Sequence, residues 1–88
     1  MSRDEFIALL DREGFREIVT VEREAHGALG VHTHPHEAKA LVLAGEIRIE
    51  TDDAATTYGV GQVFHLAAGE PHAERYGPAG VRYVVGRR

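Results

Sequence analysis

The sequence has no cysteine and no tryptophan, and only three prolines and one methionine in 88 residues. Without cysteine the chain has no disulfide, no thiolate metal ligand and no thiol nucleophile. No apolar run approaches the roughly 20 residues that a membrane-spanning helix needs. The chain begins Met-Ser-Arg-Asp-Glu, which is acidic where a signal peptide needs a basic and then an apolar stretch. We therefore expect a cytoplasmic protein with no membrane partner.

Positive charge is scarce as well. Ten lysines and arginines against fourteen aspartates and glutamates give a net charge of −4, and the basic residues are scattered apart from the pair Arg87–Arg88. Because phosphate binding depends on a positive field, nucleic acid is not expected as a partner. The length and an apolar fraction of 43% predict one small globular domain, residues 1–88.

The start of the chain predicts one amphipathic helix over about residues 2–13. Ser2 and Glu5 have the spacing of a capping box, in which each residue hydrogen-bonds the backbone of the other. The apolar residues at helical spacing, and the glycine expected to stop the helix, are Phe6, Leu9, Leu10 and Gly14. We expect this helix to cover one end or edge of the remaining structure.

After residue 14 the apolar period changes from about 3.6 to 2, which predicts strands separated by turns. The predicted strands are 15–24, 29–34, 38–44, 47–51, 63–66, 72–75 and 81–85, with 56–58 as a further short one. Gly45 and the segment 77–80 are among the expected breaks. Short strands without helices between them are typical of an antiparallel β-barrel or sandwich, here over about residues 15–86. Exposed strand edges in so short a chain predict a two-fold homodimer.

Histidine is unusually frequent, with four of the six histidines in residues 26–36. In an extended strand His32 and His34 share a face, with Cα atoms roughly 6.7 Å apart, so both imidazoles can reach one ion. Pro35 is expected to end that strand because it has no N–H to donate. A loop that ends at Pro71 then brings His72 to the start of a later strand.

These residues resemble the two sequence motifs of the cupin superfamily of small β-barrels. The residues that match the first motif are His32, His34 and Gly45. The residues that match the second motif, at the right spacing, are Gly61, Gly69 and His72. The two motifs span about half of the chain, which therefore resembles a small single-domain cupin with a jelly-roll barrel.

The chain departs from the cupin motifs at several positions. The glutamate of the first motif falls at Ala38 or Lys39, and Glu37 is the nearest carboxylate, one residue early and on the other face of an extended strand. Ala67 replaces the proline of the second motif, and Tyr76 replaces its asparagine. The resemblance therefore implies a three-histidine centre without the usual glutamate.

The resemblance implies a divalent transition metal (iron, manganese, nickel, zinc or copper) held by His32, His34 and His72. Three neutral imidazoles leave open positions on such an ion for water or a substrate. The implied function is dioxygenase or isomerase chemistry on a small organic molecule. The alternative is a non-catalytic module that binds or senses a metal or a small ligand.

Several assignments stay open at this stage. The three histidines could instead line a barrel without a metal. Metal-bound histidines usually donate their second N–H to a carboxylate or carbonyl, and Glu74 is the better candidate for that role, with Glu37 the other. Whether Glu37, His36 or Glu74 completes the metal shell also stays open. Three histidines are expected outside the centre: His26 on the surface, His36 in a turn and His65 on the opposite side of its strand. Tyr76 and Tyr83 either line the pocket or pack in the core.

Overall fold

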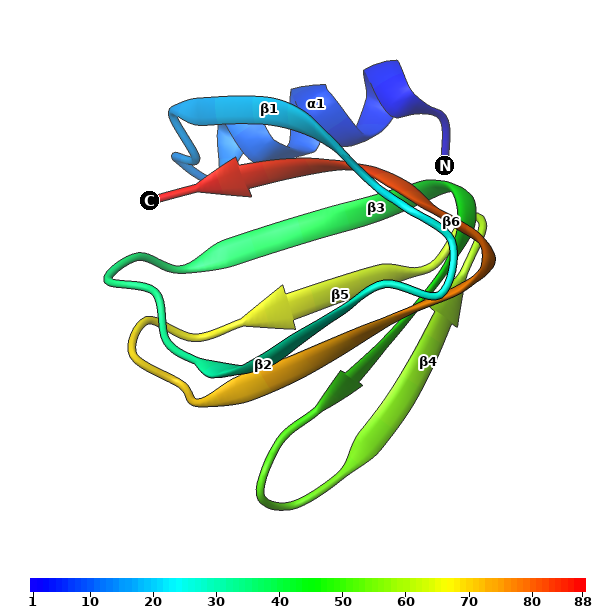
Figure 1. Ribbon diagram of the computed structural model, residues 1–88. Helices are drawn as coiled ribbons and strands as arrows, with labels where there is room; N and C mark the ends of the chain where they lie inside the picture. The colour runs from blue at the N-terminus through cyan, green and yellow to red at the C-terminus, as the bar shows by residue number, and fades with distance from the viewer.

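The computed structural model describes residues 1–88 and shows an antiparallel β-structure with one short helix, α1 (Arg3–Arg12) (Figure 1). This confirms the all-β fold class with an N-terminal helix. The six strands are β1 (Glu17–Arg23), β2 (Ala28–His32), β3 (Ala38–Glu50), β4 (Ala55–Gly59), β5 (Val63–Leu66) and β6 (His72–Arg87).

The helix begins as the sequence predicts. The Ser2 hydroxyl accepts a hydrogen bond from the backbone N–H of Glu5 at 3.1 Å, and the Ser2 N–H donates to Oε1 of Glu5 at 2.9 Å. This reciprocal capping lowers the pKa of the Glu5 carboxyl. After the helix ends, Gly14 has φ +85°, a left-handed conformation that glycine adopts readily.

The strands form two layers that share their two longest members. In one layer the first half of β3 pairs with β5 and with the second half of β6, which in turn pairs with β1. In the other layer the second half of β3 pairs with β4 and with the first half of β6, which pairs with β2. All pairs are antiparallel, and the two layers fold over one another as a jelly roll (Figure 1).

Both shared strands bend between the layers without ending. The prediction that Gly45 and residues 77–80 divide separate strands is therefore wrong, and six strands form where seven or eight were expected. Gly45 and Gly80 both have φ +71°, and a Cβ atom on Gly45 would lie 2.0 Å from the carbonyl oxygen of Gly80. These glycines let two bent backbones cross at a distance that leaves no room for a side chain.

The main core lies between the two layers and consists of the alternate, inward-facing residues of the strands. Its eleven buried members are Ala38, Ala40, Val42, Ile47, Ile49, Phe64, Leu66, Tyr76, Val81, Tyr83 and Val85. A second, smaller core lies on the outer face of the first layer, where α1 packs: Phe6, Leu10, Phe15, Leu41 and Val84. The helix thus covers a sheet face and not an end or edge of the barrel, because Leu41 and Val84 alternate outward.

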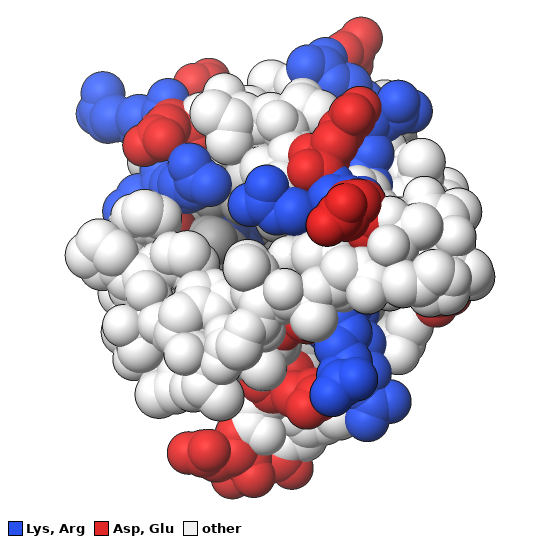
Figure 2. Space-filling model, in the orientation of Figure 1, with Lys and Arg blue, Asp and Glu red and all other residues white.

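Charge is unevenly distributed over the face shown in Figure 2. Basic side chains lie beside acidic ones along its upper part, whereas the region over β2 and the neighbouring loops is uncharged. Residues 27–36 indeed contain no lysine, arginine, aspartate or glutamate, and the Val31 side chain among them is 78% exposed. The single helix, α1, lacks the length and the apolar character to cross a bilayer.

Candidate metal centre

Two antiparallel strands bring the predicted histidines together. His32 is the last residue of β2, and His72 is the first residue of β6, and the two are register partners. His34 follows β2 in the turn toward β3, because β2 ends earlier than predicted. The backbone N–H of Gly69 donates to the carbonyl oxygen of His34 at 2.8 Å, which ties this turn to the loop before β6.

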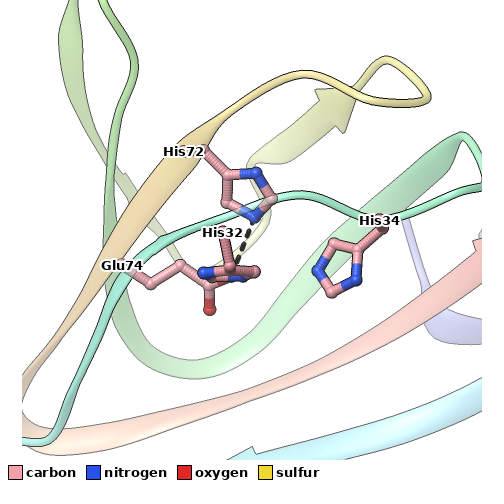
Figure 3. Close-up of side chains that lie close together, drawn as sticks. All are labelled: His32, His34, His72 and Glu74. Carbon is pink, nitrogen blue, oxygen red and sulfur yellow. Dashed lines mark hydrogen bonds and ion pairs between the residues drawn. The ribbon is translucent and has the colours of Figure 1, made fainter.

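The three imidazole rings form one cluster. Ring centroids lie 4.3 Å apart for His32 and His72, 4.9 Å for His32 and His34, and 5.3 Å for His34 and His72. Glu74 adds a carboxylate from the same face of β6 (Figure 3). The ligand atoms of these four residues all lie within 4.8 Å of one another, so the cluster could hold a metal ion.

Backbone carbonyl groups fix the orientation of two of the rings. Nδ1 of His32 lies 2.6 Å from the carbonyl oxygen of Gly30, and Nδ1 of His72 lies 3.0 Å from that of Glu70. Because a carbonyl oxygen only accepts, each Nδ1 carries the proton and each Nε2 of the neutral ring presents a lone pair. In this tautomer the backbone carbonyls, and not Glu74, take the Nδ1–H groups, while Glu74 contacts Nε2 of His72.

Glu74 instead faces the lone pairs. Its Oε2 lies 3.2 Å from Nε2 of His72 and 3.3 Å from Nε2 of His32. Nε2 of His32 is fully buried and has no hydrogen-bond partner, since its geometry to Glu74 is not that of a hydrogen bond. Acceptors that converge in this way repel one another unless a cation lies between them. The donor set of imidazole nitrogen and carboxylate oxygen suits the transition metals of the predicted group.

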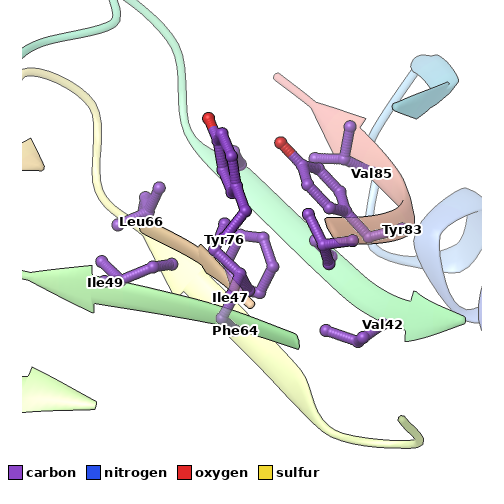
Figure 4. Packing of buried hydrophobic residues seen from close by; sticks show 11 residues of the cluster. Val42, Ile47, Ile49, Phe64, Leu66, Tyr76, Tyr83 and Val85 are labelled. Carbon is purple, nitrogen blue, oxygen red and sulfur yellow. The ribbon is translucent and has the colours of Figure 1, made fainter. Parts of the chain in front are cut away.

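A buried tyrosine holds the other oxygen of this carboxylate. The Tyr76 hydroxyl donates to Oε1 of Glu74 at 3.1 Å. Burial, followed by the adjacent Glu74 charge, raises the pKa of Tyr76 to about 12, so the hydroxyl remains a donor at neutral pH. Figure 4 shows the rings of Tyr76 and Tyr83 with their hydroxyl groups pointing the same way out of the packed core. The carboxylate is thereby oriented with Oε2 toward the histidines.

His34 is a half-buried member of the cluster whose pKa is shifted by its surroundings. Partial burial, and then the neighbouring His32 and His72, lower the pKa of His34 below its ordinary value of 6.5. Its ring is therefore unprotonated, as a metal ligand must be, at neutral pH. The ring of His36 stacks on that of His34 with centroids 5.6 Å apart, outside the group that could share an ion.

The remaining candidates lie away from the cluster. His26 is exposed in the turn between β1 and β2. His65 points outward, as predicted, and pairs with Glu37, which also receives a hydrogen bond from Arg88 at 2.6 Å. These charges line an open groove of about 490 Å³ together with Lys39. Glu37 therefore takes no part in the histidine cluster, which agrees with its position on the other face.

A small cavity adjoins the cluster inside the barrel. It measures about 40 Å³, and its walls include His34, Glu74, Tyr83 and Arg87. Arg87 was not singled out from the sequence. Its inward position could have been predicted, because Tyr83, Val85 and Arg87 alternate along one strand and therefore share a face. The cavity connects the candidate metal ligands with a phenol and a guanidinium.

A family model described as the cupin domain matches residues 19–83. The match covers well over half of the chain, so this protein belongs to the cupin family, as its motifs predicted. The matched residues include all four members of the histidine cluster. No curated protein matches the chain.

Solved structures share the fold. The crystal structure of a protein of unknown function from Rhizobium leguminosarum has a TM-score of 0.76 and 21% identity, over 80% of this chain and 66% of that protein. The DMSP lyase DddQ from Ruegeria pomeroyi has a TM-score of 0.73 and 26% identity, over 81% of this chain and 36% of the lyase. A mutant of Bacillus subtilis oxalate decarboxylase OxdC has a TM-score of 0.72 and 17% identity, over 80% of this chain and 20% of the decarboxylase. This chain spans less than two thirds of each of these proteins.

Proposed function

We propose that this cupin holds one divalent transition-metal ion and uses it to bind and convert a small organic molecule. The proposed ligands are three imidazole nitrogens and one carboxylate oxygen, from His32, His34, His72 and Glu74. Iron, manganese, nickel, zinc and copper all remain compatible with these ligands. When bound, the ion would supply a Lewis acid that polarises an oxygen atom of the substrate.

The observation that carries the proposal is the buried, unpartnered Nε2 of His32. It faces a second lone pair, on His72, and the Glu74 carboxylate at 3.2–3.3 Å from the two nitrogens. A barrel that merely enclosed polar residues would satisfy these groups with donors, because an unpartnered buried polar group costs about 1–3 kcal/mol. The carbonyl groups that hold the two Nδ1–H groups are the outer contacts that metal-binding histidines usually make.

The test is the metal content of protein purified without added metal, followed by calorimetric titration with Zn²⁺ and Mn²⁺. We expect one ion per chain, with affinity reduced at least as strongly in His72→Ala as in His34→Ala, although 38 positions separate the two residues. His65→Ala is the matched control, since His65 lies outside the cluster and should leave the affinity unchanged. A His72→Ala variant that keeps wild-type affinity would place any ion within the turn around residues 32–36 and refute the proposed centre.

The class of reaction stays a prediction. The resemblance to the cupin motifs implies dioxygenase or isomerase chemistry, and the structural neighbours include a lyase and a decarboxylase. The buried Glu74 beside a cavity favours chemistry over simple metal storage, since a carboxylate oriented by Tyr76 can also hold or accept a proton. A non-catalytic sensing module would bind the same ion and ligand without turnover, so mass spectrometry of candidate small molecules after incubation with metal-loaded protein separates the two functions.

We also propose a homodimer formed through β2. This strand pairs with β6 on one side alone, and its surroundings are uncharged over residues 27–36, so two copies could meet there without burying an unpaired charge. Val31→Glu should convert a dimer to a monomer in light scattering at micromolar concentration. Val60→Glu, also at an exposed valine but away from β2, should not. A monomeric wild-type mass would contradict the dimer. The cytoplasmic location stays a prediction from the sequence.

A further inference from the structure

The cavity beside the histidine cluster is lined by groups of different chemistry. Its polar and charged lining includes His34 and Glu74 of the proposed metal centre together with Tyr83 and Arg87, two inward-facing residues of β6. Apolar residues such as Phe64 and Val85 also line it. A molecule that fills the cavity therefore lies beside the proposed metal centre and beside the Tyr83 and Arg87 side chains.

The Tyr83 hydroxyl is a donor without a partner in the protein. The Tyr83 residue is 8% exposed, and its hydroxyl has no hydrogen-bond partner among the protein side chains. Burial, followed by the negative charge of Glu74, raises that pKa to about 12, so the hydroxyl keeps its proton throughout the neutral range. A protonated phenol that faces a cavity can donate one hydrogen bond to whatever enters.

Arg87 supplies a positive charge with unused donors. Its Nη1 lies 3.1 Å from Oε1 of Glu17, an exposed carboxylate of β1, and its side chain is 31% exposed. A guanidinium has five N–H donors in a planar fork, so this one contact leaves others available. The fork matches the two oxygens of a carboxylate, which it can bind in a bidentate manner.

The charges around the cavity favour an anion. A divalent ion, the Arg87 guanidinium and the Glu74 carboxylate together leave an excess of positive charge in a partly water-excluded space. The cavity of about 40 Å³ has room for roughly three water-sized groups, since one water needs about 10–15 Å³. A carboxylate group, with three heavy atoms, is of this size.

We infer that the cavity binds the carboxylate of a small organic acid, with Arg87 and Tyr83 as its donors, so that the rest of the molecule lies against the proposed metal centre. The inference names the ligand class for the proposed function and rests on it. In this arrangement Arg87 and Tyr83 select a carboxylate over a neutral molecule of the same shape, because a neutral amide cannot satisfy the guanidinium charge. Glu17 competes with the ligand for Arg87.

The test is an NMR titration of ¹⁵N-labelled protein with acetate and with acetamide, its neutral analogue, both without metal and with Zn²⁺ bound. Acetate should shift the amide signals of residues 34–38 and 83–87 in a saturable manner, more tightly with Zn²⁺, and acetamide should not. Arg87→Gln should weaken acetate binding about 10-fold or more, because hydrogen bonds to a charged group are strong. Arg82→Gln, on the same strand but facing outward, is the matched control and should bind as wild type.

Two further variants keep the test decisive if Arg87→Gln fails to fold. Tyr83→Phe should also weaken acetate binding, and Glu17→Gln should tighten it, because the competing carboxylate is removed. Equal binding of acetate and acetamide, or equal effects of the two arginine variants, would overturn the inference. If instead Zn²⁺ itself does not bind, the proposed metal centre fails, whereas acetate binding in the metal-free protein still reports on Arg87 and Tyr83 separately.

Discussion

Oε2 of Glu74 lies 3.2 Å from Nε2 of His72, two residues away on the same buried face of β6. Both atoms are acceptors when His72 donates its Nδ1–H to a backbone carbonyl, so the pair calls for a cation. Glu74→Gln should therefore lower metal affinity by at least the 10–100-fold that losing an outer partner costs. At pH 8 the metal-free variant should melt no lower than wild type, because the glutamine amide can donate to Nε2.

The measurements for this prediction are calorimetric titration with Zn²⁺ and thermal melting of the metal-free protein. Glu70→Gln is the matched control, since Glu70 accepts the hydrogen bond from His72 with its backbone carbonyl and not with its carboxylate. Wild-type Zn²⁺ affinity in Glu74→Gln would show that this carboxylate is not a ligand.

Tyr76→Phe should weaken metal binding through Glu74. The substitution removes one hydrogen bond to a charged oxygen, worth about 1.5–3 kcal/mol, and frees the carboxylate to rotate away from the histidines. Zn²⁺ affinity should fall by about 10-fold or more, which is the equivalent of one such bond. Tyr58→Phe is the control, because Tyr58 packs against Phe64 without contacting the cluster. Equal affinities of both variants would remove Tyr76 from the site.

Gly45→Ala should destabilise the fold much more than Gly61→Ala. Both glycines have positive φ angles, +71° and +85°, a strain of about 1–3 kcal/mol for alanine. At Gly45 the new methyl group would also lie 2.0 Å from the Gly80 carbonyl oxygen, whereas nothing lies within 4 Å of a Cβ on Gly61. Thermal melting of the two variants compares the close crossing with φ strain alone. A similar loss in both would mean that the crossing relaxes easily.

Glu37 should make the protein acid-sensitive. Hydrogen bonds from Arg88 and then from His65 lower the pKa of the Glu37 carboxyl below its ordinary value of 4.5. Because the folded-state pKa is the lower one, this stabilisation is present above the unfolded-state pKa and is lost as pH falls through the folded-state value. Chemical denaturation between pH 3 and pH 7 should show a smaller acid loss in Glu37→Gln than in wild type. Asp53→Asn, in an exposed turn, should leave the profile unchanged.

Metal should raise the melting temperature, and acid should abolish the increase. Binding to the folded state alone adds about 2.7 kcal/mol when free metal is 100 times the dissociation constant. The pKa of His34 is lowered from its ordinary value of 6.5, so its ring is neutral at pH 7. In the folded protein this ring takes up its proton at a lower pH than a free imidazole does. Melting with and without Zn²⁺ should therefore differ at pH 7.5 and converge as pH falls below about 6. A metal increment that persisted at pH 5 would argue against imidazole ligands.

The sequence predicted the helix, the class of fold and the shared face of His32 and His34, because each depends on a local signal. A capping box, an apolar period and a pair of histidines two residues apart are all visible in one segment of chain. The meeting of His72 with His32 and His34 was predicted through the second cupin motif, since spacing alone does not say which strands pair; their register was not predicted. The outward position of His65 followed from its alternation with Phe64 and Leu66.

The parts that could not be predicted depend on contacts between distant segments. Gly45 resembles a turn glycine in the sequence, and only the backbone of Gly80 opposite reveals that it allows a crossing. The role of Glu74 stayed open between orienting a histidine and completing the metal shell, because the carbonyl groups of Gly30 and Glu70 that accept the Nδ1–H groups carry no sequence signal. Arg87 was passed over because an arginine next to Arg88 reads as a solvated chain segment.

The shared strands have a consequence for folding. Because β3 and β6 each run through both layers, neither layer holds a complete set of strands unless the other is assembled. The first residue of β3 pairs with the last residue of β6. Half of the molecule is therefore not an autonomous unit, and two fragments cut at the β4–β5 turn should regain structure only when mixed. The histidine cluster would then appear and vanish together with helix docking, since His72 and Val84 stand on one continuous strand.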